Sequence, residues 1–447
     1  MSLHAIPREH NISLGEFRRK YLATATPVVV SGIMEDWDAG LLNFSALNDL
    51  CGHGPVFGFC GDPNQSQLKY HAAGLDTKWA SLGVMPRDDA NLANLSQLLA
   101  AQQNGSFSLA APSSSWLPSW LDMSHPTVHG PELYLHDSPL HHHCPALLRR
   151  LRSPKYFPVN LLQQLGPGVA SHRADGCGAL SIKPSLFIGA ASSRSGLHVD
   201  AHGTRFWMGV LHGTKMWRLA DPRSSAKLRR MRPTACDRTI SGLRRASSLE
   251  ADSRVYNELC PGMGADLFAP GGGGSGQDDD DGALEDAMLP MSVWEANVSA
   301  GELIFIPELW AHQVHNVDAT IAISNNFVDD DSFTNYVRLA DALLEFYKRA
   351  PSGSIDANAV GATARRLLKA GFARETPEFP WYSLNALSDD LPDANWDAYA
   401  ENNAWRRSLG EAMTAEEHDA AFQAWIEGGG AARFLSALET ERSVPWA

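Results

Sequence analysis

The chain has 447 residues, of which 44% are hydrophobic and 9% aromatic. This length and composition allow one large domain with an appendage, or two domains, and exclude a wholly disordered chain. The formal net charge is −14, with 51 Asp and Glu against 37 Lys and Arg. Because phosphate contacts need clustered cations, we expect no direct nucleic-acid binding, whereas a basic protein or peptide suits an acidic surface.

The N-terminal sequence MSLHAIPREHNISLGEF has no apolar core of a signal peptide, and no run approaches the roughly 18 apolar residues of a membrane helix. We therefore expect no membrane association and a location in the nucleus or the cytoplasm. Six cysteines occur, namely Cys51, Cys60, Cys144, Cys177, Cys236 and Cys260. Since their spacing is irregular and contains no C-x-x-C pair, we predict free thiols rather than a zinc site or a disulfide framework.

The first region, residues 1–130, is expected to pack on a core further along the chain. Residues 12–24 have apolar side chains at helical spacing, and 27–32 form a β-branched run that ends at a glycine. A second strand is predicted over 55–60. A second helix is predicted over 90–104, where Asn-Gly ends the helical pattern.

The second region, residues 131–335, is dense in short apolar segments. Strands are predicted over 132–137, 184–190, 204–211, 214–220, 302–307, 313–317 and 320–328. His212-Gly213 separates two of these segments and predicts a hairpin. Many short strands with turns between them predict a mainly β core, an antiparallel barrel or sandwich, with flanking helices.

A long insertion, about residues 222–290, interrupts these strands. It begins with a basic part and ends with the sequence GGGGSGQDDDDG at 271–282, which cannot bury enough apolar surface to order itself. We predict a disordered insertion, whose basic part either contacts an acidic partner or forms a solvated helix face. Region 336–447 is predicted to be helical, with helices over 335–350, 357–371, 403–414 and 416–429.

The sequence SGLHVD at 195–200 carries two candidate metal ligands, His198 and Asp200. On an extended strand, residues two apart lie on the same face, about 6.5–7 Å apart along the chain. His312, which follows the apolar segment ending at Pro307, supplies a third ligand. Two histidines and one carboxylate leave coordination positions free, an arrangement that suits non-haem Fe(II).

Lys215 lies 17 residues after His198, in an otherwise apolar and aromatic strand. A buried lysine is costly unless an anion accompanies it, and the distal carboxylate of 2-oxoglutarate is a suitable anion. Ser324 and Asn326 share one face of their strand and can add hydrogen bonds. Four aromatic residues, Phe206, Trp207, Trp217 and Phe305, are expected to keep the pocket around the ligands dry.

These segments resemble the JmjC (Jumonji C) oxygenases, a cupin-type family with a double-stranded β-helix, or jelly-roll, fold. The family pattern of H-x-D, G-T-x-x-W and G-x-K-x-W is matched by HVDAHGTRFWMGVLHGTKMWRL from residue 198. The family's distal pattern, F-x-P-x-x-W-x-H-x-V-x-N-x-D-x-T-I-x-I, is matched by FIPELWAHQVHNVDATIAISNNF from residue 305. The resemblance covers about residues 12–335 apart from the insertion, and is nearest to the small phosphatidylserine-receptor-like members.

The resemblance implies iron ligation by His198, Asp200 and His312, and 2-oxoglutarate binding by Lys215. It also implies that the cosubstrate is contacted by Ser195, Tyr134, Ser324 and Asn326. Two positions depart from the family: Met208 stands where relatives often carry asparagine, and Ala311 replaces a second tryptophan before the distal histidine.

The implied activity is an Fe(II)-, 2-oxoglutarate- and O₂-dependent dioxygenase that hydroxylates a protein side chain, as lysyl hydroxylases do, with succinate and CO₂ as coproducts. Demethylation of N-methylated lysine or arginine uses the same iron site and is an alternative. A catalytically silent cupin that binds a partner protein is another. In relatives, C-terminal helices dimerise the enzyme or shape the substrate groove, so a homodimer through 336–447 is one expectation.

Overall fold

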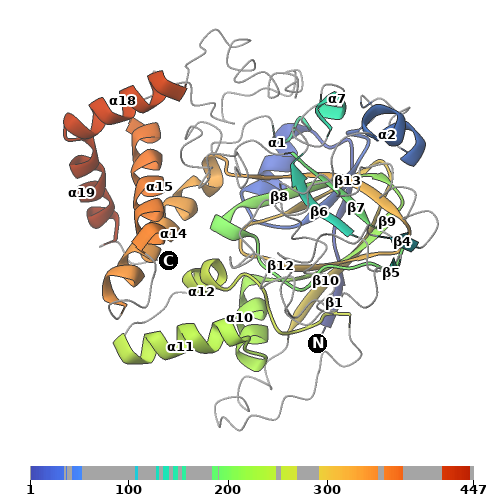
Figure 1. The fold of residues 1–447 in the computed structure, drawn as a ribbon, viewed down its shortest axis with the longest axis horizontal. Helices are drawn as coiled ribbons and strands as arrows, with labels where there is room; N and C mark the ends of the chain where they lie inside the picture. Colours follow the sequence, from blue (N-terminus) through green and yellow to red (C-terminus); the bar gives the residue numbers. More distant parts are fainter. Residues whose placement is uncertain are drawn as a thin grey trace.

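Two facing β-sheets form the centre of the protein in the computed structural model (Figure 1). The structure describes residues 2–34, 37, 43–52, 106–108, 127–129, 134–139, 144–148, 154–157, 184–189, 191–247, 253–268, 291–350, 357–375 and 415–442. The predicted strand over 55–60 and the predicted helices over 90–104 and 403–414 lie outside these residues.

The smaller sheet has four strands and the larger has seven. In spatial order, the four are β1 (Ser2–Ala5), β10 (Ser292–Ser299), β9 (Thr214–Ala220) and β12 (Ala311–Asn316). The seven are β2 (Arg8–His10), β3 (Val28–Ser31), β11 (Glu302–Ile306), β8 (Arg205–His212), β13 (Thr320–Phe327), β7 (Ser185–Gly189) and β6 (Tyr134–Pro139). A separate pair joins β4 (Ser106–Ser108) and β5 (Thr127–His129). The N-terminal strands β1 to β3 thus belong to the core sheets.

From β10 to β13 each successive strand lies in the other sheet, as in a jelly roll, and the predicted cupin-like β fold is confirmed. The predicted hairpin at His212-Gly213 is wrong, because β8 pairs with β11 and β13 while β9 pairs with β10 and β12. The turn instead carries the chain from one sheet to the facing one. Gly213 has φ +74°, and a Cβ there would lie 2.2 Å from the carbonyl oxygen of Ala319, so the crossing requires glycine.

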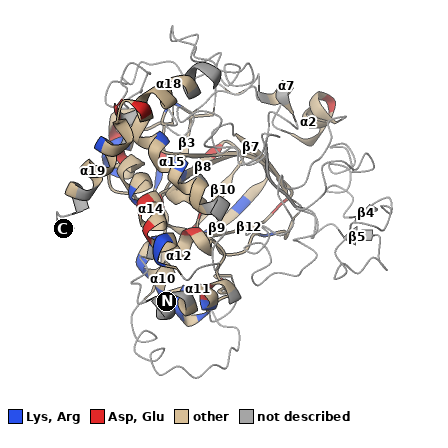
Figure 2. Ribbon diagram, turned by 60° about the vertical axis from the view of Figure 1, so that its left-hand side comes forward, with Lys and Arg blue, Asp and Glu red and all other residues tan. Residues whose placement is uncertain are grey.

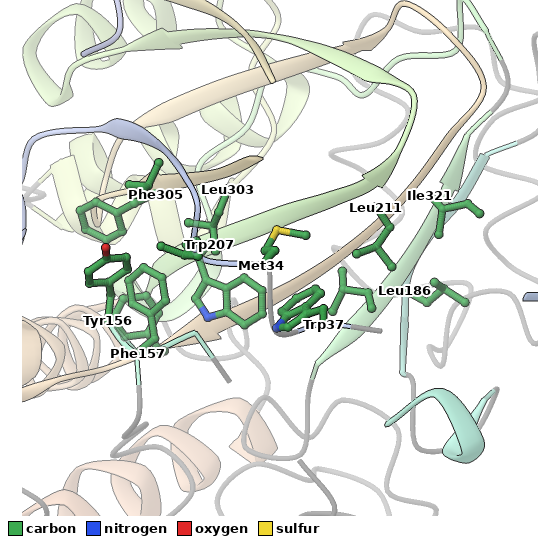
Figure 3. Packing of buried hydrophobic residues seen from close by; sticks show 14 of the residues in the cluster. Met34, Trp37, Tyr156, Phe157, Leu186, Trp207, Leu211, Leu303, Phe305 and Ile321 are labelled. Atoms are coloured by element: carbon green, nitrogen blue, oxygen red, sulfur yellow. The ribbon is translucent and has the colours of Figure 1, made fainter. Parts of the chain in front are cut away.

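Side chains of the larger sheet alternate between an inner face, toward the smaller sheet, and an outer face. On β8, Phe206 and Met208 are buried with β9 and β12 residues inside the barrel, whereas Trp207 belongs to the outer cluster. Figure 3 shows this outer cluster, in which Trp207 stacks on Phe157 with ring centroids 5.9 Å apart. Helix α1 (Leu14–Phe17) and the following π-helical turn η1 (Arg18–Leu22) also bury their apolar side chains there.

The first part of the insertion is ordered, so the prediction of disorder is wrong for these residues. It forms helices α10 (Pro222–Met231), α11 (Ala235–Ser247) and α12 (Ser253–Leu259). Arg229 is buried and donates to Asp237 at 2.6 Å and to Asn257 at 3.2 Å, so part of the basic charge serves internal ion pairing. Sequence periodicity could not show this pairing between helices. The run at 271–282 lies outside the described residues.

The described residues of the C-terminal region form helices, which pack beside the barrel (Figure 1). Its helices are α14 (Asp330–Arg349), α15 (Ala357–Glu375), α18 (Ala415–Glu427) and α19 (Gly430–Arg442). They share an apolar cluster of their own. Charged residues are more frequent on the helices than on the strands (Figure 2). Among the described residues, none of the helices combines the length and apolarity needed to cross a bilayer.

Four cysteines are paired, so the prediction of free thiols is wrong for them. Cys51, at the end of α2 (Phe44–Cys51), bonds Cys144, which precedes α7 (Pro145–Leu148). Cys236 on α11 bonds Cys260, which follows α12. The Cα atoms lie 5.4 and 5.8 Å apart, a separation set by tertiary packing rather than by spacing along the chain. Cys60 and Cys177 lie outside the described residues.

Candidate metal centre

The segment around His198 is held between two neighbouring chain segments. On one side, His198 and His312 exchange two backbone hydrogen bonds of 2.8 and 3.1 Å across to β12. On the other side, the end of the insertion pairs with it, with the Val199 N–H donating to Pro261 and the Met263 N–H donating to Leu197. This pairing places two histidines that are far apart in sequence directly opposite each other.

His198, Asp200 and His312 come together as the sequence motifs indicated. One ligand atom from each lies within 4.8 Å of the others. Asp200 Oδ1 is 3.8 Å from His198 Nε2 and 3.7 Å from His312 Nε2. Two imidazole nitrogens and a carboxylate oxygen that converge in this way can bind one divalent transition-metal ion and leave coordination positions for other ligands.

Each histidine ring is oriented by a backbone carbonyl. His198 Nδ1 lies 2.8 Å from Gly196 O, and His312 Nδ1 lies 3.2 Å from Trp310 O. Because a carbonyl oxygen only accepts, each Nδ1 carries a proton and each Nε2 keeps its lone pair toward Asp200. Burial lowers the pKa of His312 to about 4, so its ring is neutral near pH 7 and able to bind a metal.

Asn326 lies against the candidate ligand Asp200. Its Nδ2 donates to Asp200 Oδ2 at 3.0 Å and to Thr204 Oγ1 at 3.1 Å. Asn326 is predicted to contact the cosubstrate, and in the structure its amide lies on the Asp200 carboxylate. Since Oδ2 is bonded there, Oδ1 is the oxygen directed at the histidines.

The four aromatic residues expected around the ligands divide between the two faces of the larger sheet. The rings of Phe206 and Trp217 lie 5.9 and 5.8 Å from the His312 ring, inside the barrel. Trp207 and Phe305 lie in the outer cluster (Figure 3), so the expectation is wrong for them. The alternation of side chains along β8 and β11 explains this division.

Lys215 is fully buried on β9, on the same face as Trp217. Its Nζ donates to Asn316 Oδ1 at 2.7 Å, and Thr320 Oγ1 donates to the same oxygen at 3.1 Å. Burial lowers the pKa of the Lys215 ammonium to about 7. An anion beside the ammonium would favour its protonated form and raise the pKa again, and the charged ammonium would in turn bind the anion.

Strand β13 runs along the barrel wall between the candidate metal ligands and Lys215. On β13, Asn326 contacts Asp200, Thr320 contacts the amide that binds Lys215, and Ser324 lies between them. Ser324 pairs in register with Ser185 on β7. Within the described part of the chain, neither hydroxyl has a hydrogen-bond partner, and the same is true of Trp217 Nε1. Buried polar atoms normally have partners, so these three donors are available to a polar ligand that reaches this wall.

The other predicted contacts are placed as follows. Ser195 Oγ accepts the Val314 N–H at 3.1 Å and thereby helps to join its segment to β12. Met208 is buried inside the barrel and pairs in register with Ser324, so this side of the wall is apolar. Tyr134 lies on β6 and pairs with Gly189, but its side chain lies outside the described part of the chain.

Sequence reasoning missed Ser185 and Asn316. Ser185 begins a buried strand with no motif around it, and only the register with β13 places it beside Ser324. Asn316 is the asparagine of the distal motif, so the motif itself could have identified it as a candidate site residue. Its amide also donates to Ser193 at 2.7 Å, and a Cβ on Gly189 would lie 2.0 Å from its Nδ2, so glycine there makes room for the asparagine.

Comparison with known proteins agrees with this geometry. Residues 14–333 match the family described as the cupin-like domain. A segment of 44 residues is 46% identical to the human 2-oxoglutarate and iron-dependent oxygenase JMJD4, covering 10% of this chain and 11% of that protein. A segment of 235 residues is 25% identical to the arginine-specific demethylase JMJ22 of Arabidopsis thaliana, covering 48% of this chain and 34% of that protein. The matched segments thus span well under two thirds of either relative.

Proposed function

The chain belongs to the cupin-like domain family, its resemblance to the JmjC oxygenases is confirmed, and we propose that it is an iron- and 2-oxoglutarate-dependent oxygenase that hydroxylates a protein side chain. The donor set fits Fe(II), since two imidazoles and one carboxylate supply three ligands. In this role His198, Asp200 and His312 hold the iron, and Asn326 fixes the orientation of Asp200.

One observation carries the cosubstrate assignment. A fully buried lysine lies at one end of the barrel interior, the metal ligands lie toward the other, and three donors without partners lie between them. 2-Oxoglutarate carries anionic groups at both ends, so it suits a site with a metal at one end and a cation at the other. Lys215 binds the distal carboxylate, while Ser324, Ser185 and Trp217 Nε1 donate to oxygen atoms along the way.

When bound, iron and 2-oxoglutarate together activate O₂ to oxidise a C–H bond of the substrate, with succinate and CO₂ as coproducts. The chain's own residues bind, orient and exclude water. Phe206 and Trp217 cover the His312 ring, and the apolar interior cluster around them keeps the site dry. The net charge of −14 favours a basic protein or peptide as the substrate.

The test is consumption of 2-oxoglutarate by the full chain loaded with Fe(II) under anaerobic conditions and then exposed to O₂ with a library of basic peptides. We expect succinate to form with the wild type and none with Asp200→Ala, because the carboxylate ligand is lost. Wild-type protein that binds neither iron nor 2-oxoglutarate would leave a silent protein-binding cupin as the better description.

Mass spectrometry of the treated peptides identifies the reaction. Hydroxylation adds one oxygen atom to a peptide, which is the expected result. Removal of a CH₂ unit from a methylated peptide would favour the demethylase alternative. That alternative draws on the similarity to a relative named as an arginine-specific demethylase.

A further inference from the structure

The turn that follows Asp200 is held by two side chains from outside the barrel. We propose that Glu258 on α12 and Arg366 on α15 are positioning residues for the metal ligand Asp200, so that the insertion and the C-terminal helices are parts of the metal centre. This inference rests on the proposed metal-dependent function.

The backbone of this turn adopts a conformation that must be held in place. Asp200 directly precedes the 3₁₀ turn η5 (Ala201–Gly203), in which His202 has φ +61° and Gly203 has φ +59°. A left-handed conformation at histidine is unfavourable and persists only where its surroundings hold it. Relaxation of the turn would move the Asp200 carboxylate relative to His198 and His312, which are fixed by strand pairing.

Glu258 supplies the direct restraint. Its Oε2 accepts the backbone N–H of His202, and its Oε1 lies 2.5 Å from His202 Nδ1. Burial raises the pKa of Glu258, but the neighbouring His202 and Arg366 hold that pKa at about 2, so the carboxylate is ionised. A charged acceptor on a backbone N–H forms a stronger hydrogen bond than a neutral one.

Arg366 joins the C-terminal helices to the same cluster. Its guanidinium lies against His202 Nδ1 and 3.6 Å from Glu258 Oε1, and only about a tenth of either side chain is exposed. Helix α14 contributes as well, since a Cβ on Gly203 would lie 3.3 Å from Leu339. Three regions that are distant in the sequence therefore meet at the turn behind Asp200.

Helix α12 is itself anchored on both sides. The disulfide Cys236–Cys260 ties its end to α11, and residues 261–263, which follow it, pair with the segment that carries His198. Glu258 is thus attached to a segment that already borders the metal ligands. This arrangement lets α12 set the position of the turn relative to His198.

The test measures Co(II) affinity of the full chain by absorption spectroscopy, at a temperature where circular dichroism shows every variant folded. Glu258→Ala is expected to bind Co(II) about 10- to 100-fold more weakly, which is the usual effect of losing a residue that holds a metal ligand in place. Glu258→Gln retains an acceptor for the His202 N–H and is expected to recover most of this loss. Arg366→Met, which removes the α15 contact alone, is expected to weaken binding several-fold and replaces Glu258→Ala if that variant does not fold.

The matched control is Glu375→Ala on α15, the helix that carries Arg366, because the Glu375 carboxylate contacts Trp425 on α18 and Arg433 on α19 rather than the turn. It is expected to lose stability but to keep wild-type Co(II) affinity. Glu258→Ala with unchanged affinity, or Glu375→Ala with an equal loss, would overturn the positioning role and leave the proposed function standing. Wild-type protein that binds no Co(II) would overturn the proposed function, and this inference with it.

Discussion

The two faces of the seven-stranded sheet are built from the same strands and differ in chemistry. The outer face is mainly apolar and aromatic: Trp207 and Phe305 lie near Phe157 (Figure 3), Phe327 contacts Phe157, and Phe305 contacts the N-terminal helix at Phe17. The inner face carries polar side chains among apolar ones, and two of its hydroxyls, on Ser185 and Ser324, have no partner. Partnerless polar atoms also occur on the outer side, at Trp37 Nε1 and Asn325 Oδ1, so what distinguishes the inner face is that it lies beside the candidate metal ligands and the buried Lys215. The inner face is therefore organised for a ligand, and the outer face for stability.

The largest expected effect is on the outer face. Trp207→Ala removes a fully buried indole that stacks on Phe157 and should lower the free energy of unfolding by about 3–5 kcal/mol. Urea unfolding measures this loss. Co(II) affinity of the remaining folded protein should be unchanged, and a fall in that affinity would show that the two faces are not separable.

On the inner face, Lys215 should make cosubstrate binding depend on pH. Burial lowers its pKa to about 7, and the carboxylate is bound by the protonated form, so affinity should fall about tenfold per pH unit above 7. Titration of Co(II)-loaded protein with 2-oxoglutarate between pH 6 and 9 measures this. Lys215→Met should bind 2-oxoglutarate more weakly at pH 6, and its affinity should no longer depend on pH. If the variant kept the pH dependence, Lys215 would not be the group that causes it.

The same lysine affects stability with a definite sign. Its pKa is about 7 in the folded chain and 10.5 when unperturbed, so between these values the unfolded chain binds more protons. The stability of the ligand-free protein should therefore decrease, through this group, as the pH falls from about 10.5 to about 7, and change no further below that. Lys215→Met should remove this contribution in thermal unfolding.

Two adjacent residues on β13 allow the two faces of the sheet to be tested separately near the metal ligands. Asn326→Ala should weaken Co(II) binding about tenfold, because Asp200 loses the amide that orients it. Asn325 is also buried but points to the opposite face, so Asn325→Ala is the matched control and should keep wild-type affinity. Equal losses in both variants would indicate a general disturbance of the strand.

The smallest effect is expected from the partnerless hydroxyls. Ser324→Ala and Ser185→Ala each remove one hydrogen bond to 2-oxoglutarate, worth about 1 kcal/mol, and should raise its KM roughly fivefold. Stability should be unchanged or slightly higher, because a buried hydroxyl without a partner is removed. An unchanged KM in both variants would place the cosubstrate elsewhere in the barrel.

Prediction from the sequence succeeded where local pattern decides structure. The alternating apolar segments predicted β8, β9, β12 and β13, and helical spacing predicted α14, α15 and α18. Strand β10 was missed although Glu295 and Asn297 alternate with the apolar Trp294, Ala296 and Val298, which is a strand pattern. The hairpin was misassigned because a tight turn specifies a reversal of the chain and not which sheet the next strand joins.

The sequence by itself determined the metal ligands as a set. Residues two apart on an extended segment share a face, which joins His198 to Asp200, and the distal motif adds His312. Tertiary structure alone decided which atoms surround them. Strand register sets Ser185 opposite Ser324, and helix packing brings Glu258 and Arg366 behind Asp200. Contacts of this kind depend on the closure of the sheets and the docking of helices, which short-range patterns in the chain do not encode.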